Sequence, residues 1–185
     1  MRHIIQNALV SLNGVYNEAA IPRFGEYGNP AYGGDEVYML DALDQALSCS
    51  ALLIGRMTYE LFITNWPKRT DPWADRINAM PKYVFSSTLE KADWNNTTII
   101  RGDVVAEVTK LKQQEGHDLL IYGAGLFAET LLKHHLVDAL TLSIFPFVTG
   151  QGKQIFRQDD PPALKHVATK SFSRGLLKLT YELQY

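Results

Sequence analysis

The chain has 185 residues and a formal net charge of −2 at pH 7, from 18 Lys and Arg against 20 Asp and Glu. This length favours one domain, which we take to span residues 1–185. Hydrophobic residues make up 46% of the sequence, which excludes a disordered or collagen-like chain. The balanced charge argues against non-specific nucleic-acid binding.

The single cysteine, Cys49, excludes an internal disulfide and any paired-cysteine metal motif, and we expect it to be a buried small residue. The five histidines show no metal-ligand spacing and are expected to be solvated. No apolar run approaches the roughly 20 residues that cross a bilayer, and the N-terminal apolar stretch is too short for a signal peptide. We therefore expect a cytoplasmic protein with no membrane association and no metal.

Short apolar runs alternate with helical periodicity as far as residue 135, which is typical of a mostly parallel sheet flanked by helices. The expected strands are residues 3–10, 51–54, 83–85, 97–101 and 118–122. The expected helices are residues 35–47, 58–62, 104–115 and 126–135. The first helix carries one apolar stripe, formed by Val37, Leu40, Leu43 and Leu47. Between the first strand and this helix, residues 15–34 are expected to form a long loop.

From Asp138 onward the pattern changes to alternating apolar and polar residues. Half-buried strands are expected at residues 140–145, 165–171 and 176–183, with no helix between them. The fold class is therefore α/β, with a mixed, mostly parallel central sheet and antiparallel C-terminal strands.

Ligands of open α/β sheets bind at the carboxyl ends of the strands, and three turns at such positions carry unusual residues. Residues 55–58 combine a glycine, which allows close backbone approach, with an arginine that matches a phosphate. Residues 86–88 offer three successive hydroxyls. Residues 123–128 match the G-x-G-x-x-A dinucleotide fingerprint. Each turn alone also fits a tight turn or a helix cap, but together they predict a nucleotide or dinucleotide site.

A conventional NAD-binding Rossmann domain is disfavoured. The glycine motif lies late in the chain, and no acidic residue ends a strand about 20 residues beyond it to hold a ribose.

Five motifs identify a resemblance to a known family. They occur in the family's order and are Asn7–Gly14, Leu52–Glu60, Met80–Leu89, Ile121–Gly125, and Leu136–Leu140 followed by Pro146 and Gly150–Lys153. Through these motifs nearly the whole chain resembles the dihydrofolate-reductase-like family, which includes the reductase half of the bifunctional deaminase-reductase of riboflavin biosynthesis. The resemblance implies a three-layer α/β/α fold, NADPH as the cofactor, and a homodimer joined through the C-terminal antiparallel strands.

The resemblance also implies positions for the cofactor. Ala8 and Leu9 would lie near the nicotinamide, and Ser86 and Ser87 near the adenine ribose and its 2′-phosphate. The pyrophosphate and the adenosine side would be held by Gly55, Arg56 and Thr58. The pyrophosphate would also lie at a helix N-terminus formed by Gly123, Ala124, Gly125, Leu126 and Phe127. We expect Arg56 to favour NADPH over NADH, because a guanidinium matches a phosphate better than a pair of hydroxyls.

The substrate side matches the family less closely. Asp35 is the candidate catalytic acid, although it fits the N-cap of a helix equally well. The family's usual aspartate before the first glycine is Asn13 here, which removes a charge. The loop of residues 150–153 is either a surface turn or a segment that closes on substrate or binds a phosphate through Lys153. Two locations are possible for the aromatic residues: they either line a pocket for a flat ring or belong to the core or an interface. These residues are Tyr16, Tyr27, Tyr32, Trp66 and Trp73.

The expected function is hydride transfer from NADPH to an electron-poor C=N or C=O carbon of a small heterocyclic or sugar-derived substrate. Within this class, a 5-amino-6-(5-phosphoribosylamino)uracil reductase-type activity is the nearest alternative, in a chain without the deaminase's Cys/His zinc motif. Dihydrofolate reduction fits less well, because no acidic residue clearly matches. In a different class, a nucleotide-binding sensor or interaction protein would bind the cofactor without turnover.

Overall fold

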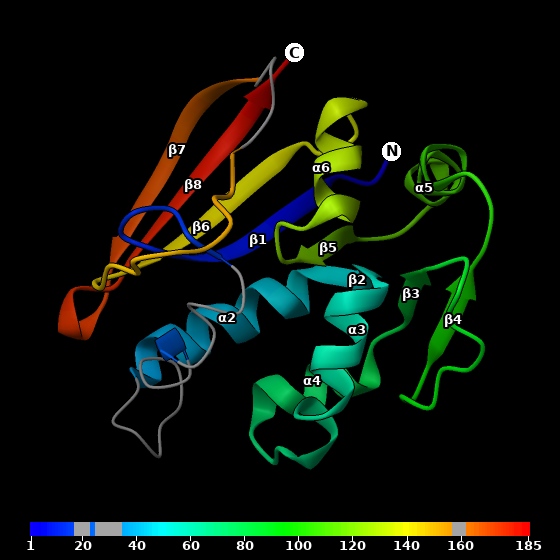
Figure 1. Cartoon of the computed structure of the whole chain (residues 1–185), viewed down its shortest axis with the longest axis horizontal. Coiled ribbons are helices and arrows are strands. Elements are labelled where there is room, and N and C mark those ends of the chain that lie inside the picture. The colour runs from blue at the N-terminus through cyan, green and yellow to red at the C-terminus, as the bar shows by residue number, and fades with distance from the viewer. Residues whose placement is uncertain (17–22, 25–34, 157–161) are drawn as a thin grey trace.

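The computed structural model describes residues 1–16, 23–24, 35–156 and 162–185. One eight-stranded sheet crosses the molecule in the order β4-β3-β2-β5-β1-β6-β8-β7 (Figure 1). The strands are β1 (Ile4–Ser11), β2 (Cys49–Gly55), β3 (Lys82–Phe85), β4 (Thr97–Ile100), β5 (Asp118–Tyr122), β6 (Ala139–Phe145), β7 (Ala163–Ser171) and β8 (Leu177–Gln184). The helices are α2 (Glu36–Ser48), α3 (Arg56–Ile63), α4 (Pro72–Ala79), α5 (Val104–Gln113) and α6 (Leu126–Lys133), with short 3-10 turns η2 (Trp66–Lys68) and η3 (Ser173–Gly175).

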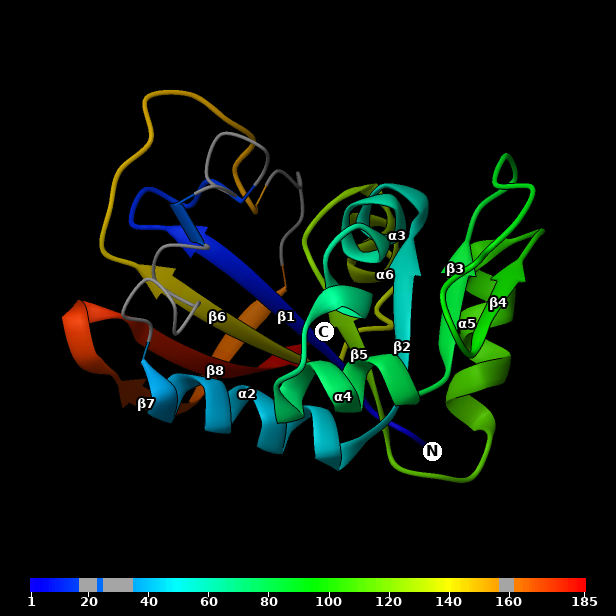
Figure 2. The same cartoon turned by 90° about the horizontal axis from the view of Figure 1, so that it is seen from below.

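The six strands from β4 to β6 in this order pair in parallel, whereas β8 pairs antiparallel with both β6 and β7. The prediction of a mostly parallel sheet with an antiparallel C-terminal end is therefore confirmed. Helices α2, α3 and α4 cover one face of the sheet, and α5 and α6 cover the other (Figures 1 and 2). This gives three layers, α/β/α, with a hydrophobic core on each side of the central strands.

Three of the four residues of the apolar stripe expected on α2 face solvent, and the fourth, Leu43, is half-buried. Val37, Leu40 and Leu47 are each more than half exposed, whereas the buried side chains of the helix include Tyr38 and Ala42. The reason is that α2 packs on the sheet largely through polar contacts, so apolar periodicity indicated the wrong face. These contacts join Tyr38 Oη to Ser143 Oγ (3.2 Å), Gln45 Nε2 to Thr141 Oγ1 (3.2 Å), Gln45 to Asn7, and Asp41 to Lys178.

Strand β7 also differs from expectation. It was expected to be half-buried, but every residue except Ala168 is exposed. The strand lies at the edge of the sheet and pairs only with β8, and α2 reaches it through the ion pair of Asp41 with the exposed Lys170 (Figure 1). Alternation along the sequence indicated a strand correctly, but it does not show whether another layer covers that strand.

Helix α4 was missed by the sequence reading, and α3 begins at Arg56, two residues before its expected start. Asp71 caps α4 by accepting a hydrogen bond from Ala74 N (3.1 Å), and Pro72 takes the first helical position, where no N–H is needed. This Asp-Pro pair is a recognisable start signal for a helix.

Cys49 is fully buried, as expected. Among the described residues, no helix has both the length and the apolar character needed to cross a membrane. Most of the loop expected at residues 15–34 lies outside the described residues, as do residues 157–161.

Candidate functional site

The three turns singled out in the sequence lie at one edge of the sheet. They follow β2, β3 and β5, which pair in parallel in the order β3-β2-β5, so their carboxyl ends point the same way. Strand β1 is the next neighbour of β5 and runs parallel to it. Figure 2 shows α3 and α6 beginning together at this edge. The residues that the sequence analysis proposed for a dinucleotide are thus brought together, along four adjacent strands.

The first turns of α3 and α6 touch. A Cβ placed on Gly55, the residue before α3, would lie 3.1 Å from Phe127 Cβ, and one placed on Gly123 would lie 3.5 Å from Thr58 Oγ1. Gly123 also has a φ of +102°, a conformation that favours glycine. Neither helix has a side-chain cap, so the N–H groups of both first turns remain available to a ligand. Two uncapped helix N-termini side by side suit an anionic group.

Alanine substitutions of Gly125 and Gly55 are expected to have different effects, the first on ligand binding and the second on stability. Gly125 has open space where a Cβ would lie and a φ of −80° that alanine adopts easily, so we expect Gly125→Ala to change the melting temperature little. We expect the same change to weaken NADPH binding at least tenfold, because its methyl group occupies the approach to the helix N-terminus. Gly55→Ala should instead lower stability by about 1–3 kcal/mol, because Phe127 Cβ obstructs it. Thermal melts and NADPH titrations of both variants check this. Equal NADPH affinity in Gly125→Ala and the unsubstituted protein would contradict it.

The serine turn after β3 is held by an arginine that the sequence analysis missed. Arg101, directly after β4, donates to Ser87 O (3.2 Å) and Leu89 O (2.7 Å). Ser86 Oγ accepts from the backbone N–H groups of Thr88 and Leu89, so its own hydroxyl hydrogen remains available. Arg101 lies beside the serines because β3 pairs with β4. The sequence itself showed only that an arginine follows the end of an expected strand.

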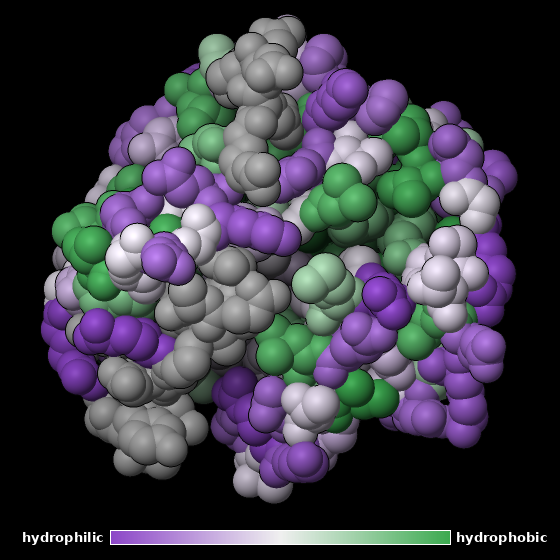
Figure 3. Space-filling view, viewed as in Figure 1, coloured by the Kyte–Doolittle hydropathy of each residue, from purple (hydrophilic) through white to green (hydrophobic). Residues whose placement is uncertain are grey.

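Arg56 opens α3 and forms an ion pair with Glu60 (3.4 Å) one helical turn away. Both side chains are about half exposed, so the pair stabilises little and leaves the guanidinium accessible. Two apolar residues in the first turns of α3 and α6 are exposed, Met57 at 64% and Leu126 at 79%. Figure 3, which looks onto this edge of the sheet, shows apolar side chains gathered among polar ones. Such a mixture suits a ligand with both a flat ring and phosphates.

Strand β1 borders the glycine turn through Ala8 and Asn7. Ala8 is buried and packs in one cluster with Ala124, while Leu9 is half-buried and packs on the opposite face with the Tyr38 cluster. Gly123 N donates to Asn7 O (2.9 Å), which fixes the turn against β1. Of the two residues expected beside a nicotinamide, Ala8 therefore lies next to the expected pyrophosphate turn, whereas Leu9 faces the other side of the sheet.

Asp35 is the N-cap of α2. Its Oδ1 accepts from Val37 N (2.8 Å) and Tyr38 N (3.2 Å), and its Oδ2 accepts from Ser173 N. Burial raises the pKa of Asp35, but the hydrogen bonds from Ser173 and the helix outweigh it and hold the pKa below its ordinary value. A carboxylate of this kind stays ionised near neutral pH, which suits a helix cap better than a proton donor. The catalytic role of Asp35 stays a prediction.

The aromatic residues Trp66 and Trp73 belong to a packed cluster. Trp66 is buried and stacks on Tyr122 at 6.4 Å, and Trp73 Nε1 donates to Tyr122 Oη (3.1 Å). Burial raises the pKa of Tyr122 well above its ordinary value. Arg69, which the sequence analysis missed, lies over both indole rings at 4.5 and 5.2 Å and donates from Nε to Asp71 (2.8 Å). Tyr27 and Tyr32 lie outside the described residues.

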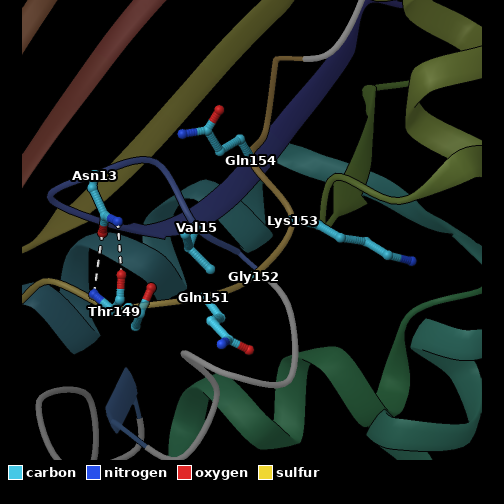
Figure 4. Close-up of a pocket in the computed structure, with 8 residues that line it drawn as sticks. Asn13, Val15, Thr149, Gln151, Gly152, Lys153 and Gln154 are labelled. Carbon is cyan, nitrogen blue, oxygen red and sulfur yellow. Dashed lines mark hydrogen bonds between the residues drawn. The ribbon is translucent and has the colours of Figure 1, made fainter.

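A polar hollow of about 570 Å³ lies beyond β1, between the turn after β1 and the loop after β6 (Figure 4). It is lined by Asn13, Val15, Thr149, Gly150, Gln151, Gly152, Lys153 and Gln154. No group of His, Cys, Asp and Glu side chains suited to a metal occurs in the described part of the chain, and all five histidines are exposed.

The chain is similar to proteins of one family along nearly its whole length. Residues 2–178 match the model of the RibD C-terminal domain. The uncharacterized protein YyaP of Bacillus subtilis (strain 168) is 35% identical over 136 residues, which cover 70% of this chain and 72% of YyaP.

Two solved structures share the fold. One, from Shewanella sp. PV-4 and provisionally assigned to riboflavin biosynthesis, has a TM-score of 0.76 with 18% identity and covers 99% of both chains. The other is the dihydrofolate reductase of Enterococcus faecalis in complex with NADP(H) and an inhibitor, RAB-propyl. It has a TM-score of 0.60 with 15% identity and covers 99% of this chain and 97% of that one. At these identities the likeness shows the dihydrofolate-reductase-like fold alone.

Proposed function

The chain belongs to the RibD C-terminal domain family, and on that premise we propose that it is a reductase that uses NADPH to reduce a small heterocyclic or sugar-derived substrate. The observation that carries this proposal is the junction of two uncapped helix N-termini, α3 and α6, beside the serine turn and β1. The E. faecalis neighbour of the same fold is in complex with NADP(H), which supports the choice of cofactor.

We assign the cofactor along the edge of the sheet from β3 to β1. Ser86, Ser87, Arg56 and Arg101 would hold the 2′-phosphate and adenine ribose. The pyrophosphate would lie at the first turns of α3 and α6, contacted by Gly55, Thr58, Gly123, Ala124, Gly125, Leu126 and Phe127. Ala8 and Leu9 would border the nicotinamide.

Few protein groups are required for the chemistry. The bound nicotinamide supplies the hydride, and the protein aligns the two reacting carbons and excludes water. The buried strand β1 gives the site a rigid wall, and the apolar side chains of Met57 and Leu126 cover ring surfaces. Asp35 accepts three backbone hydrogen bonds as the N-cap of α2, and its role as the catalytic acid stays a prediction.

Arg56→Ala is expected to reduce the preference for NADPH over NADH about tenfold while changing NADH affinity little. The guanidinium interacts with the 2′-phosphate, which only NADPH carries. Titrations of both cofactors against both proteins measure the ratio directly. An unchanged NADPH-to-NADH ratio in Arg56→Ala would remove Arg56 from the assignment.

Turnover distinguishes the reductase from its alternatives. Oxidation of NADPH, followed by its absorbance, is measured with a panel of pterins, dihydrofolate and the pyrimidine 5-amino-6-(5-phosphoribosylamino)uracil. This pyrimidine is included because a fold neighbour from Thermotoga maritima is described as its reductase. We expect turnover of at least one heterocycle. NADPH binding without turnover of any panel member would favour the nucleotide-binding sensor.

We propose that two copies associate through the exposed hairpin of β7 and β8. Leu164 and Leu177 are exposed and Leu183 is half-buried, and the strand register places all three on the sheet face opposite α2. An uncovered apolar sheet face at an edge strand favours association with another chain. Solution scattering is expected to report twice the 20.8 kDa mass of one chain. A monomeric mass at all concentrations would refute the dimer.

A further inference from the structure

The loop after β6 is held in place at both ends (Figure 4). At its start, Asn13 Nδ2 donates to Thr149 O (2.9 Å) and Asn13 Oδ1 accepts from Thr149 N (3.2 Å). At its end, residues 14–16 pair with residues 153–155 through two backbone hydrogen bonds of 3.1 and 3.0 Å. Residues 150–152 therefore span the gap between two fixed points and form a wall of the hollow.

This short span presents backbone donors. The N–H groups of Gly150, Gln151 and Gly152 donate to no acceptor within the described ranges of the chain. Gly152 has a φ of +143°, a conformation that favours glycine. A Cβ placed on Gly150 would meet nothing within 4 Å, so the backbone is open to a ligand at Gly150. Three successive unpaired N–H groups in an anchored loop are a common way to bind an oxyanion.

The charges around the hollow also favour an anion. Among the described residues that line it there is no carboxylate, and Lys153 is the one that carries a charge. Asn13 is a neutral amide, with both of its polar atoms engaged. Figure 4 shows the Lys153 side chain leaving the loop toward the side of the molecule that carries the β5–α6 turn. The side chain extends away from the other labelled lining residues, so its charge lies at the outer side of the hollow, toward the candidate site.

The position of the hollow separates it from the cofactor's phosphates. It lies at the carboxyl ends of β1 and β6, whereas the glycine turn follows β5 on the other side of β1. We propose that this hollow binds a phosphate group of the substrate, with the N–H groups of residues 150–152 and the Lys153 ammonium as its donors. That the bound phosphate belongs to a substrate rests on the proposed reductase function. The anion site itself is inferred from the geometry of the loop.

Two variants test the site through different interactions. Lys153→Gln removes the positive charge. Asn13→Asp introduces a carboxylate but keeps an oxygen to accept from Thr149 N. Lys133→Gln, an exposed lysine in the last turn of α6, is the matched control. Calorimetric titrations with inorganic phosphate, glycerol 3-phosphate and glycerol are made on each protein, with and without saturating NADPH, and NADPH affinity is measured separately.

We expect inorganic phosphate and glycerol 3-phosphate to bind the unsubstituted protein and glycerol not to bind. Both site variants should weaken phosphate binding at least tenfold, with NADPH affinity and the control unchanged within about threefold. Absence of phosphate binding to the unsubstituted protein, or undiminished binding to Lys153→Gln, would overturn the proposal. A parallel loss of NADPH affinity in Lys153→Gln would overturn it too, because the lysine would then serve the cofactor. Phosphate binding in a protein that does not bind NADPH would leave the anion site standing and refute the reductase.

Discussion

Asp41→Asn is expected to lower the free energy of unfolding by about 3–5 kcal/mol. Asp41 lies between α2 and the sheet with its side chain 9% exposed, and its two carboxylate oxygens accept from Lys178 Nζ (2.5 Å) and Lys170 Nζ. Lys178 is itself buried, so the substitution leaves a buried ammonium without its counter-charge. Chemical denaturation at pH 7 measures the loss.

The exposed partner provides the control. Lys170 is 61% exposed, so Lys170→Gln should cost less than about 1 kcal/mol. Burial raises the pKa of Asp41, but the two lysines outweigh it and hold the pKa below its ordinary value. The carboxylate therefore stabilises the fold above about pH 4, and this contribution is lost as the pH falls through the lowered pKa. A gap between the unsubstituted protein and Asp41→Asn that persists undiminished in strong acid would contradict this account.

Lys82→Met is expected to destabilise the protein by about 3 kcal/mol or more. Lys82 is fully buried, and its Nζ donates to the backbone oxygens of Asn78 (2.9 Å), Met80 (2.8 Å) and Asn95 (2.9 Å). It also lies 4.6 Å from the centre of the Trp94 ring. Methionine keeps the volume but leaves three carbonyl groups without a donor, at about 1–3 kcal/mol each before relaxation. A change below about 1 kcal/mol would contradict the assigned role.

The same lysine predicts a dependence of stability on pH. Burial lowers the pKa of Lys82 from 10.5 to about 8, so between these values the unfolded chain binds more protons than the folded one. The free energy of unfolding should therefore rise with pH across this window, by an amount on the order of 3 kcal/mol at most. Lys82→Met should lack this rise. Parallel denaturation curves from pH 8 to pH 10.5 for the two proteins check the sign.

The sequence predicted the parallel part of the sheet well because its strands are buried on both faces. Leu52, Leu53 and Ile54 form a continuous apolar run, and all three are fully buried. The three turns that follow such strands were also placed correctly at one edge. Parallel strands share the direction of their carboxyl ends, so a local pattern was enough to predict where the turns would meet.

The orientation of α2 could not be predicted from apolar periodicity. The helix buries Tyr38 and Asp41 against polar groups of β6 and β8, and Leu40 and Leu47 face solvent. The partners Ser143 and Lys178 lie more than 100 residues away in the chain. Periodicity along one segment carries no information about such distant polar partners.

Arg101 and Arg69 were missed for a similar reason. Arg101 acquires its position from the pairing of β3 with β4, and Arg69 from the packing of two indole rings. Nothing adjacent to either residue in the sequence indicates those contacts. Residues positioned by tertiary contacts therefore need the structure, whereas candidate residues in strand-end turns were accessible from the sequence.

The most direct test of the central claim is a titration of the purified protein with NADPH and, in parallel, with NADH, followed by tryptophan fluorescence and melting temperature. The account predicts micromolar binding of NADPH, at least tenfold tighter than that of NADH, with a rise in melting temperature that follows saturation. Absence of binding to both cofactors would contradict the proposed function and leave only the fold and the family.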